Sequence, residues 1–373
     1  MMPDTIELFL QQAPCCVLVR TALEHLFDPQ RLDDLFHDSA DDQYQHELLF
    51  SELVHLMLAV VLGQKPSVRA AYLASDIAVS PQAVYDKLKR TDLEVIEALV
   101  ADSATQTRAA VDALKAARPE PIRGRRLRIL DGNRLTGTER RLKVLRDKCS
   151  RGLPGRALAV YEPATDLVTH VFLDPDGHAG ERDRLGDVLE LVRPGDLWVA
   201  DRNFSTLACF EALSEAGGEF VVRQHGCLHG TPSGDRVACG HADTGEVFEE
   251  AIEVDGRMLR RLSLVLDTPT RDGETAIHVL TNVPKEVADG LTLMDVYRRR
   301  WSIEGRFYEM ATTMNAEPKS LANPGTALFA FGLGLVASNA MALVRAALRA
   351  VHPADDVENM SRFQIASEVR ETY

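Results

Sequence analysis

The sequence predicts a mixed α/β fold that is preceded by a purely helical segment. Apolar residues recur at helical spacing through the first 118 residues. After a linker containing proline and glycine, short apolar runs of strand length alternate with helical segments. Between residues 225 and 275, turn residues separate further strand-like runs. We therefore expect a helical N-terminal domain, an α/β core in two pieces, a β-strand insertion and a C-terminal tail: residues 1–118, 119–224 with 276–353, 225–275 and 354–373.

Composition indicates a globular protein with a sizeable core. The chain has 373 residues, of which 45% are apolar and 26% are charged. At the N-terminus no cationic stretch precedes an apolar run, and Asp4 and Glu7 come early, which indicates a cytoplasmic protein without a secretory signal. Residues 327–344 carry no formal charge, but they include Ser338 and Asn339. We interpret this segment as a buried core helix and not as a membrane span.

Charge is distributed unevenly along the chain. The net charge of −14 argues against a protein that coats DNA without specificity. From Arg118 to Arg156, however, 13 Lys and Arg face 4 Asp and Glu, a local balance of +9. A basic face that contacts phosphates and a solvated charged loop both explain this segment.

The six cysteines show no spacing typical of disulfides, so we expect them to be reduced. Cys227 with His229 and Cys239 with His241 form a repeated Cys-x-His pattern. Four such ligands can hold zinc tetrahedrally. The pairs lack the usual two-residue gap, so zinc is the less favoured interpretation.

In the N-terminal part, helices are predicted at residues 47–62, 67–74 and 81–90. Ser80 is expected to cap the third helix, with Pro81 at its first position. The outward-facing residues of this helix include an amide, an aromatic ring and two cations: Gln82, Tyr85, Lys89 and Arg90. A helix-turn-helix that reads DNA and generic helical packing both produce this pattern.

The α/β core is predicted to begin with three strands, a helix and a fourth strand, at residues 127–130, 158–161, 167–173, 181–192 and 197–200. This is the order of a ribonuclease-H-like fold, in which the fourth strand pairs beside the first. The ends of these two strands are then neighbours, so Asp131 and Asp201 are expected to lie together. Each also has a structural explanation, since Asp131 with Gly132 can form a turn and Asp201 can cap the next helix.

Beyond Asp201, a helix is expected at residues 205–216, a helix at 291–314, and strands at 220–223, 247–254, 259–266 and 277–281. In the second helix Tyr297, Arg300 and Glu304 lie three and then four residues apart, which places them on one stripe. A simple ion pair between Arg300 and Glu304 explains that spacing equally well. Trp301 is interpreted as a core residue because of its spacing with Val296 and Phe307.

Three blocks together carry a family resemblance: the strand ending at Asp131, the strand ending at Asp201, and Tyr297-x2-Arg300-x3-Glu304. They resemble the catalytic core of bacterial insertion-sequence transposases of the DDE type. More narrowly, they resemble the insertion-sequence-four group, whose signature is Tyr-x2-Arg-x3-Glu-x6-Lys and which places a β insertion before its glutamate. The resemblance covers residues 124–351, but Ala311 replaces the final lysine. We expect either weaker activity or a substitute cation from Lys319.

The resemblance implies cleavage of DNA strands at the element ends and transfer of the 3′-hydroxyl to target DNA. It implies two Mg²⁺ or Mn²⁺ ions held by the three catalytic acids Asp131, Asp201 and Glu304. The residues expected to contact DNA are Tyr297, Arg300 and, as a weaker candidate, Arg202. His178 and Glu181 are interpreted as peripheral, and Arg298, Arg299 and Arg306 as ordinary surface charge.

The expected partner is double-stranded DNA, bound by a homodimer and without a membrane. Residues 1–118 are predicted to recognise the terminal repeat of the element, whereas the core alone binds DNA without preference. A non-catalytic DNA-binding descendant of a transposase is the alternative, and a stand-alone nuclease of the same fold is a third possibility.

Overall fold

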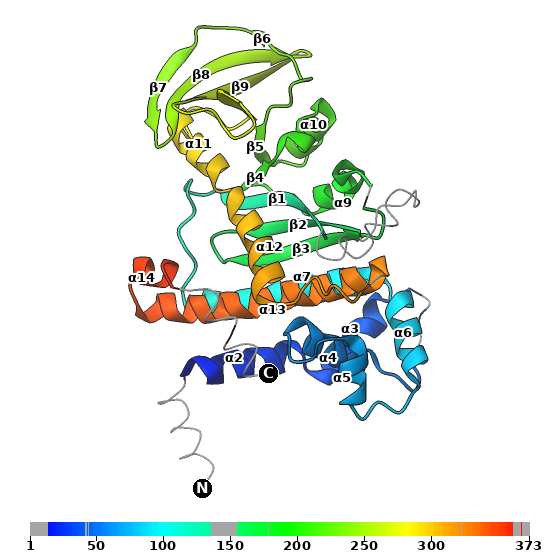
Figure 1. Ribbon diagram of the computed structural model, residues 1–373. Coiled ribbons are helices and arrows are strands. Elements are labelled where there is room, and N and C mark those ends of the chain that lie inside the picture. The colour runs from blue at the N-terminus through cyan, green and yellow to red at the C-terminus, as the bar shows by residue number, and fades with distance from the viewer. Residues whose placement is uncertain are drawn as a thin grey trace.

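The computed structural model describes residues 14–135 apart from 42 and 44, residues 155–321 apart from 178, residues 323–360, and residue 367. One mixed sheet forms the centre of the molecule. N-terminal helices and a long C-terminal helix pack at one end of this sheet, and the strands of the predicted insertion continue it at the other end (Figure 1).

The described part of the chain before residue 118 is helical, as predicted. Its helices are α2 (Pro14–Leu26), α3 (Pro29–Ser39), α4 (Phe50–Val61), α5 (Val68–Leu73), α6 (Pro81–Arg90) and α7 (Leu93–Ala113). α6 begins where the sequence places it. The Ser80 hydroxyl accepts a hydrogen bond from the Ala83 amide, and Pro81 occupies the first turn.

All the predicted strands are present. The strands are β1 (Arg126–Arg134), β2 (Arg156–Glu162), β3 (Leu167–Asp174), β4 (Asp196–Ala200), β5 (Glu219–Arg223), β6 (Thr231–Pro232), β7 (Val237–Ala242), β8 (Gly245–Val254), β9 (Arg257–Leu266) and β10 (Ala276–Thr281). They form one sheet in the order β3-β2-β1-β4-β5-β10-β9-β8-β6, and β7 pairs with β8.

The first and fourth strands are neighbours, as the sequence predicts. β1 pairs parallel to β4 with Leu130 opposite Ala200, and it pairs antiparallel to β2 on its other side. β4 is in turn parallel to β5. This order is compatible with a ribonuclease-H-like core. The insertion strands extend the same sheet, because β10 pairs antiparallel with both β5 and β9.

The helices of the second half cover this sheet. They are the short 3₁₀ helices η2 (Glu181–Arg184) and η3 (Arg202–Phe204), and α9 (Leu185–Glu190), α10 (Leu207–Glu215), α11 (Gly290–Arg298), α12 (Trp301–Thr313), α13 (Pro324–Val351) and α14 (Ala354–Glu358). The helix predicted over residues 181–192 therefore begins as a 3₁₀ turn.

The single helix predicted over residues 291–314 is divided at Arg299 and Arg300. There the Arg300 amide donates to the Tyr297 carbonyl, and the Ile303 amide donates to the Arg300 carbonyl. These i,i+3 bonds tighten the helix and change the phase of its faces. The interpretation of Trp301 as a core residue is consequently wrong: it is 45% exposed and packs edge-on against Tyr297.

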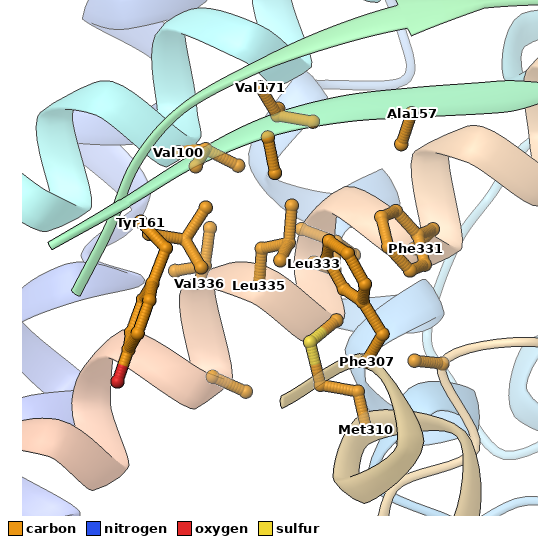
Figure 2. Packing of buried hydrophobic residues seen from close by; sticks show 14 of the residues in the cluster. Val100, Ala157, Tyr161, Val171, Phe307, Met310, Phe331, Leu333, Leu335 and Val336 are labelled. Carbon is orange, nitrogen blue, oxygen red and sulfur yellow. The ribbon is translucent and has the colours of Figure 1, made fainter. Parts of the chain in front are cut away.

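α13 is the buried helix that the sequence predicts. By length and composition it is apolar enough to cross a membrane, but 94% of its most apolar window is buried inside the protein. Figure 2 shows Phe331 and Leu333 of α13 between the strand residues Ala157 and Val171 and Phe307 of α12. α13 thus joins the sheet to the helix that carries Glu304.

The buried side-chain amide of Asn339 explains why the apolar helix α13 contains polar residues. The Asn339 side chain donates to the Val168 carbonyl and the Ser103 hydroxyl, and it accepts from the Val168 amide. Val168 lies in β3, the edge strand of the sheet. Asn339 therefore satisfies backbone groups that the edge strand would otherwise leave unpaired.

A buried ionic cluster joins α12 and α13 to the turn between β2 and β3. Asp166 lies in that turn with a positive φ of 69°, and its carboxylate accepts a hydrogen bond from the Tyr161 hydroxyl. It also forms ion pairs with Arg306 of α12 and Arg345 of α13. The interpretation of Arg306 as surface charge is wrong, since Arg306 is 1% exposed.

Replacing Asp166 with Ala should lower the free energy of unfolding by about 3–5 kcal/mol, because two buried guanidinium groups lose their partner. Asp166→Asn, which keeps a hydrogen-bond acceptor for Tyr161, should also destabilise the protein, because it removes the charge. Asp272→Ala, at an exposed loop position, should change the value by less than about 0.5 kcal/mol. Urea denaturation measures all three, and an Asp166→Ala effect no larger than that of Asp272→Ala would contradict the role of the cluster.

Candidate active site

Two acidic residues meet at the ends of parallel strands. Because Leu130 of β1 is opposite Ala200 of β4, the residues that follow them, Asp131 and Asp201, lie side by side. Asp131 is 8% exposed and belongs to the strand, not to a turn. Asp201 does cap η3, since its carboxylate accepts a hydrogen bond from the Asn203 amide at 2.8 Å. This capping role is compatible with the predicted position of Asp201 beside Asp131.

Arg300 connects the third acid, Glu304, to Asp131. Glu304 lies in the first turn of α12, and its side chain is 52% exposed. One Arg300 nitrogen donates to Glu304 Oε1 at 2.6 Å, and the other donates to Asp131 Oδ2 at 2.5 Å. The helical ion pair considered from spacing is therefore present. It is also part of a larger arrangement, because the same guanidinium joins the helix to the sheet.

The residues expected to contact DNA occupy different environments. Tyr297 is 2% exposed, and its hydroxyl is hydrogen-bonded to Arg300. Burial raises the pKa of that hydroxyl. Arg300 is itself buried, whereas the side chain of Arg202 is 58% exposed. DNA contact by these three residues stays a prediction.

Glu181 lies within the site and not at its periphery. A side chain at Gly132, the residue after Asp131, would overlap the Glu181 carboxylate. Glu181 Oε2 accepts from the Asn203 side chain at 2.9 Å, and Oε1 lies 3.7 Å from an Arg156 nitrogen. Glu181 is one of several acids between the third and fourth strands, and the sequence does not distinguish it from the others. His178 falls outside the described residues.

Asp131 and Asp201 share an environment that opposes negative charge. Burial raises the pKa of Asp131 to about 7, and the nearby charges of Asp201 and Glu304 add to the shift, while Arg300 acts against it. Burial also raises the pKa of Asp201, with a contribution from Glu181. A cation placed among these groups would relieve both the desolvation and the repulsion.

The side chains present fit a hard divalent cation. Carboxylate oxygens are the ligands that Mg²⁺ prefers, and two of the acids, Asp131 and Glu304, already bind one positive group, the Arg300 guanidinium. Within the described residues, no three His, Cys, Asp or Glu side chains stand ready-arranged around one point.

The zinc interpretation finds no support in the described residues. Cys239 lies in β7 with its sulfur 3.9 Å from a Glu249 oxygen, and His241 pairs with Asp267. Cys227 is exposed in the loop after β5. The two Cys-x-His pairs form no metal-binding group.

In the basic segment, residues 118–156, the described arginines mostly pair with acidic side chains of the protein itself. Four of its arginines form ion pairs with acidic side chains: Arg118 with Glu358, Arg125 with Glu219, Arg126 with Asp196, and Arg128 with Glu162. Residues 136–154, which carry much of the remaining charge, lie outside the described residues. The described members therefore favour a structural role over a free phosphate-binding face.

A protein-family profile matches a large part of the chain. The sequence profile of the family described as Transposase DDE domain matches residues 122–340, which is more than half of the chain. The matched region begins just before β1 and ends within α13, so it includes Asp131, Asp201 and Glu304. No curated protein matches the chain significantly.

The raised pKa of Asp131 predicts a pH-dependent stability. The carboxyl group is protonated in both folded and unfolded chains below pH 4, and above pH 7 it must be charged while buried. Asp131 should therefore lower the free energy of unfolding as the pH rises from about 4 to about 7. Asp131→Asn removes this cost, so its stability relative to the wild type should improve by roughly 2–4 kcal/mol between pH 4 and pH 8. Parallel pH profiles of the two proteins in urea denaturation would refute this account.

Proposed function

The chain belongs to the family of transposase DDE domains, and on that premise we propose that it cuts DNA strands at the ends of an insertion element and joins the freed 3′-hydroxyl to target DNA. The observation that carries the proposal is the arrangement of the three acids around two strand ends and Arg300. Asp131 and Asp201 stand at neighbouring strand ends, and Arg300 joins Asp131 to Glu304. The strands between Asp201 and Glu304, and the Tyr297-Arg300-Glu304 spacing, support assignment to the insertion-sequence-four group.

We assign Asp131, Asp201 and Glu304 as the residues that would hold two Mg²⁺ or Mn²⁺ ions. When bound, such ions supply the charge that activates an attacking oxygen and stabilises a leaving oxygen. The protein sets the charge of the carboxylates that would bind these ions. Because the pKa of Asp131 is about 7 without added cations, ligand charge, and with it metal affinity, rises as the pH passes through neutrality.

Arg300 is assigned to the DNA backbone at the same place. Its guanidinium already pairs with two carboxylates, and a phosphate offers oxygens of similar geometry. Tyr297 holds Arg300 from the buried side, which limits the positions that Arg300 can adopt. A rigid setting of this kind suits a reaction that depends on positioning.

The N-terminal helices are proposed to recognise the terminal repeat of the element, with the protein acting as a homodimer on DNA in the cytoplasm. A groove of about 1000 Å³ lies between α6 and the segment that contributes Gln43 and residues 46–48. Gln82 and Arg90 line it and are exposed, and Lys89 is exposed nearby. Tyr85 is half-buried and packs against the core, so it is the least available of the four predicted contacts.

One observation favours the alternative of a DNA-binding protein that has lost catalysis. Ala311 is exposed on α12 at the position where the group signature has a lysine. A phosphate contact of the signature is therefore missing from this helix. Metal-dependent cleavage assays on the wild-type chain separate the two functions.

Glu304→Gln should reduce metal-dependent cleavage by on the order of 100-fold or more, because a neutral amide replaces a metal ligand. DNA affinity, measured with EDTA present, should remain nearly unchanged. The matched control is Glu286→Gln, at an exposed position outside the site, which should leave both unchanged. Wild-type protein that binds DNA but cleaves none with Mg²⁺ or Mn²⁺ would establish the non-catalytic alternative.

Gln82→Ala should weaken binding to the flanking inverted repeat by about 1–3 kcal/mol relative to scrambled DNA, because an amide that reads a base edge is lost. Gln30→Ala on α3 is a closely matched control. Gln82 bonds Asp86 and Gln30 bonds Asp34, each across four residues of a helix and with both glutamines exposed. Competition mobility shifts measure the discrimination, and an equal effect of the two substitutions would make α6 a scaffold.

A further inference from the structure

A cavity of about 400 Å³ opens beside Asp201. Three segments line it: η2, the chain from η3 to the start of α10, and the loop that follows β5. Arg202 and Asn203, which directly follow Asp201, are part of the lining, and Asn203 also contacts Glu181. The cavity and the acidic site therefore share a wall.

The position of the cavity suits a ligand. β1, β4 and β5 are parallel, so the segments that follow them meet at one edge of the sheet. Ligands of open α/β sheets bind outside this carboxyl edge. A DNA strand lying across Asp131 and Asp201 would meet the loop after β5 next.

The lining is cationic in a protein of net charge −14. It contains Arg182 and Arg202 and no acidic residue. Within the described part of the chain the Arg182 side chain forms no ion pair or hydrogen bond, and the Arg202 side chain forms an ion pair only with Glu274, at 4.0 Å. The start of α10, a nine-residue helix capped by Thr206, also faces the cavity and adds the positive end of its dipole.

We propose that this cavity, the Arg182–Arg202 pocket, binds a phosphate group of the DNA strand that passes through the acidic site. The inference rests on the proposed function and adds a phosphate-binding position to it. Two guanidinium groups match the oxygens of a phosphate. Because the pocket is open and shares Arg202 and Asn203 with the surroundings of Asp201, it can hold a phosphate of a continuous strand. Its role is to position the strand relative to Asp201.

Cys227 lines the same pocket, is exposed and serves as an internal reporter. Cys209 is buried, and burial raises the pKa of its thiol to about 12, so it should not react. In the full chain with EDTA present, maleimide labelling of Cys227 is followed by peptide mass spectrometry. A random-sequence duplex should slow this labelling several-fold, whereas inorganic phosphate at the same phosphate concentration should have little effect.

The Arg182→Gln/Arg202→Gln variant should lose the protection of Cys227 by DNA. Its salt dependence of DNA binding should weaken by about two units of slope, one for each lost cation. Arg182→Lys/Arg202→Lys keeps the charges and should retain most of the slope, which guards against a misfolded double variant. The control Lys115→Gln/Arg123→Gln removes two exposed cations away from the pocket and should leave Cys227 protected.

The outcomes separate the pocket from the proposed function. Wild-type protein that binds DNA without slowing Cys227 labelling, or a glutamine variant with unchanged protection and slope, would overturn the pocket alone. Equal protection by inorganic phosphate would overturn the assignment to a DNA strand in favour of a free phosphate. A chain that binds no DNA would overturn the proposed function and the pocket with it.

Discussion

The geometry of the acidic site depends on one buried carboxylate that lies outside the site. Asp166, in the turn between β2 and β3, pairs with Arg306 of α12 and Arg345 of α13. Unpaired charge in the interior is costly, so the two helices can shift against the sheet only by breaking these pairs. α12 carries Glu304, and Arg300 directly precedes it. Asp166 therefore holds α12, and with it Glu304, against the sheet to which the Asp131 strand belongs.

Charge is segregated on the two sides of Asp201. On one side lie the carboxylates of Asp131, Glu181 and Glu304, and burial together with nearby negative charge raises the pKa of Asp131 and of Asp201 itself. On the other side lies the Arg182–Arg202 pocket, whose lining has no acid. In the proposed complex, the first environment would repel a DNA strand unless cations are present, and the second would attract it. Under the proposed function, this arrangement would couple the placement of a DNA strand to the binding of metal.

Local patterns in the sequence predicted most of the individual elements. The strands of the core, the capped start of α6 and the burial of α13 follow from apolar periodicity, turn residues and the capping preferences of Ser80 and Pro81. The neighbourhood of Asp131 and Asp201 followed from strand order. These features depend on residues that are close together in the chain, or on a strand order that recurs among α/β folds.

The sequence by itself determined the element order, the acidic residues at the strand ends and the Arg300–Glu304 spacing. Only the tertiary structure decided which charged side chains are buried and that Glu181 lies beside the two acids at the strand ends. Arg306 entered the core because a partner 140 residues earlier, Asp166, lies under α12. Trp301 lies outside the core because the helix tightens at Arg300, whose side chain donates a hydrogen bond to Asp131. Glu181 joined the site because Gly132 leaves room for its carboxylate. Periodicity describes one helix or strand at a time, whereas these outcomes depend on contacts between elements that are distant in the chain.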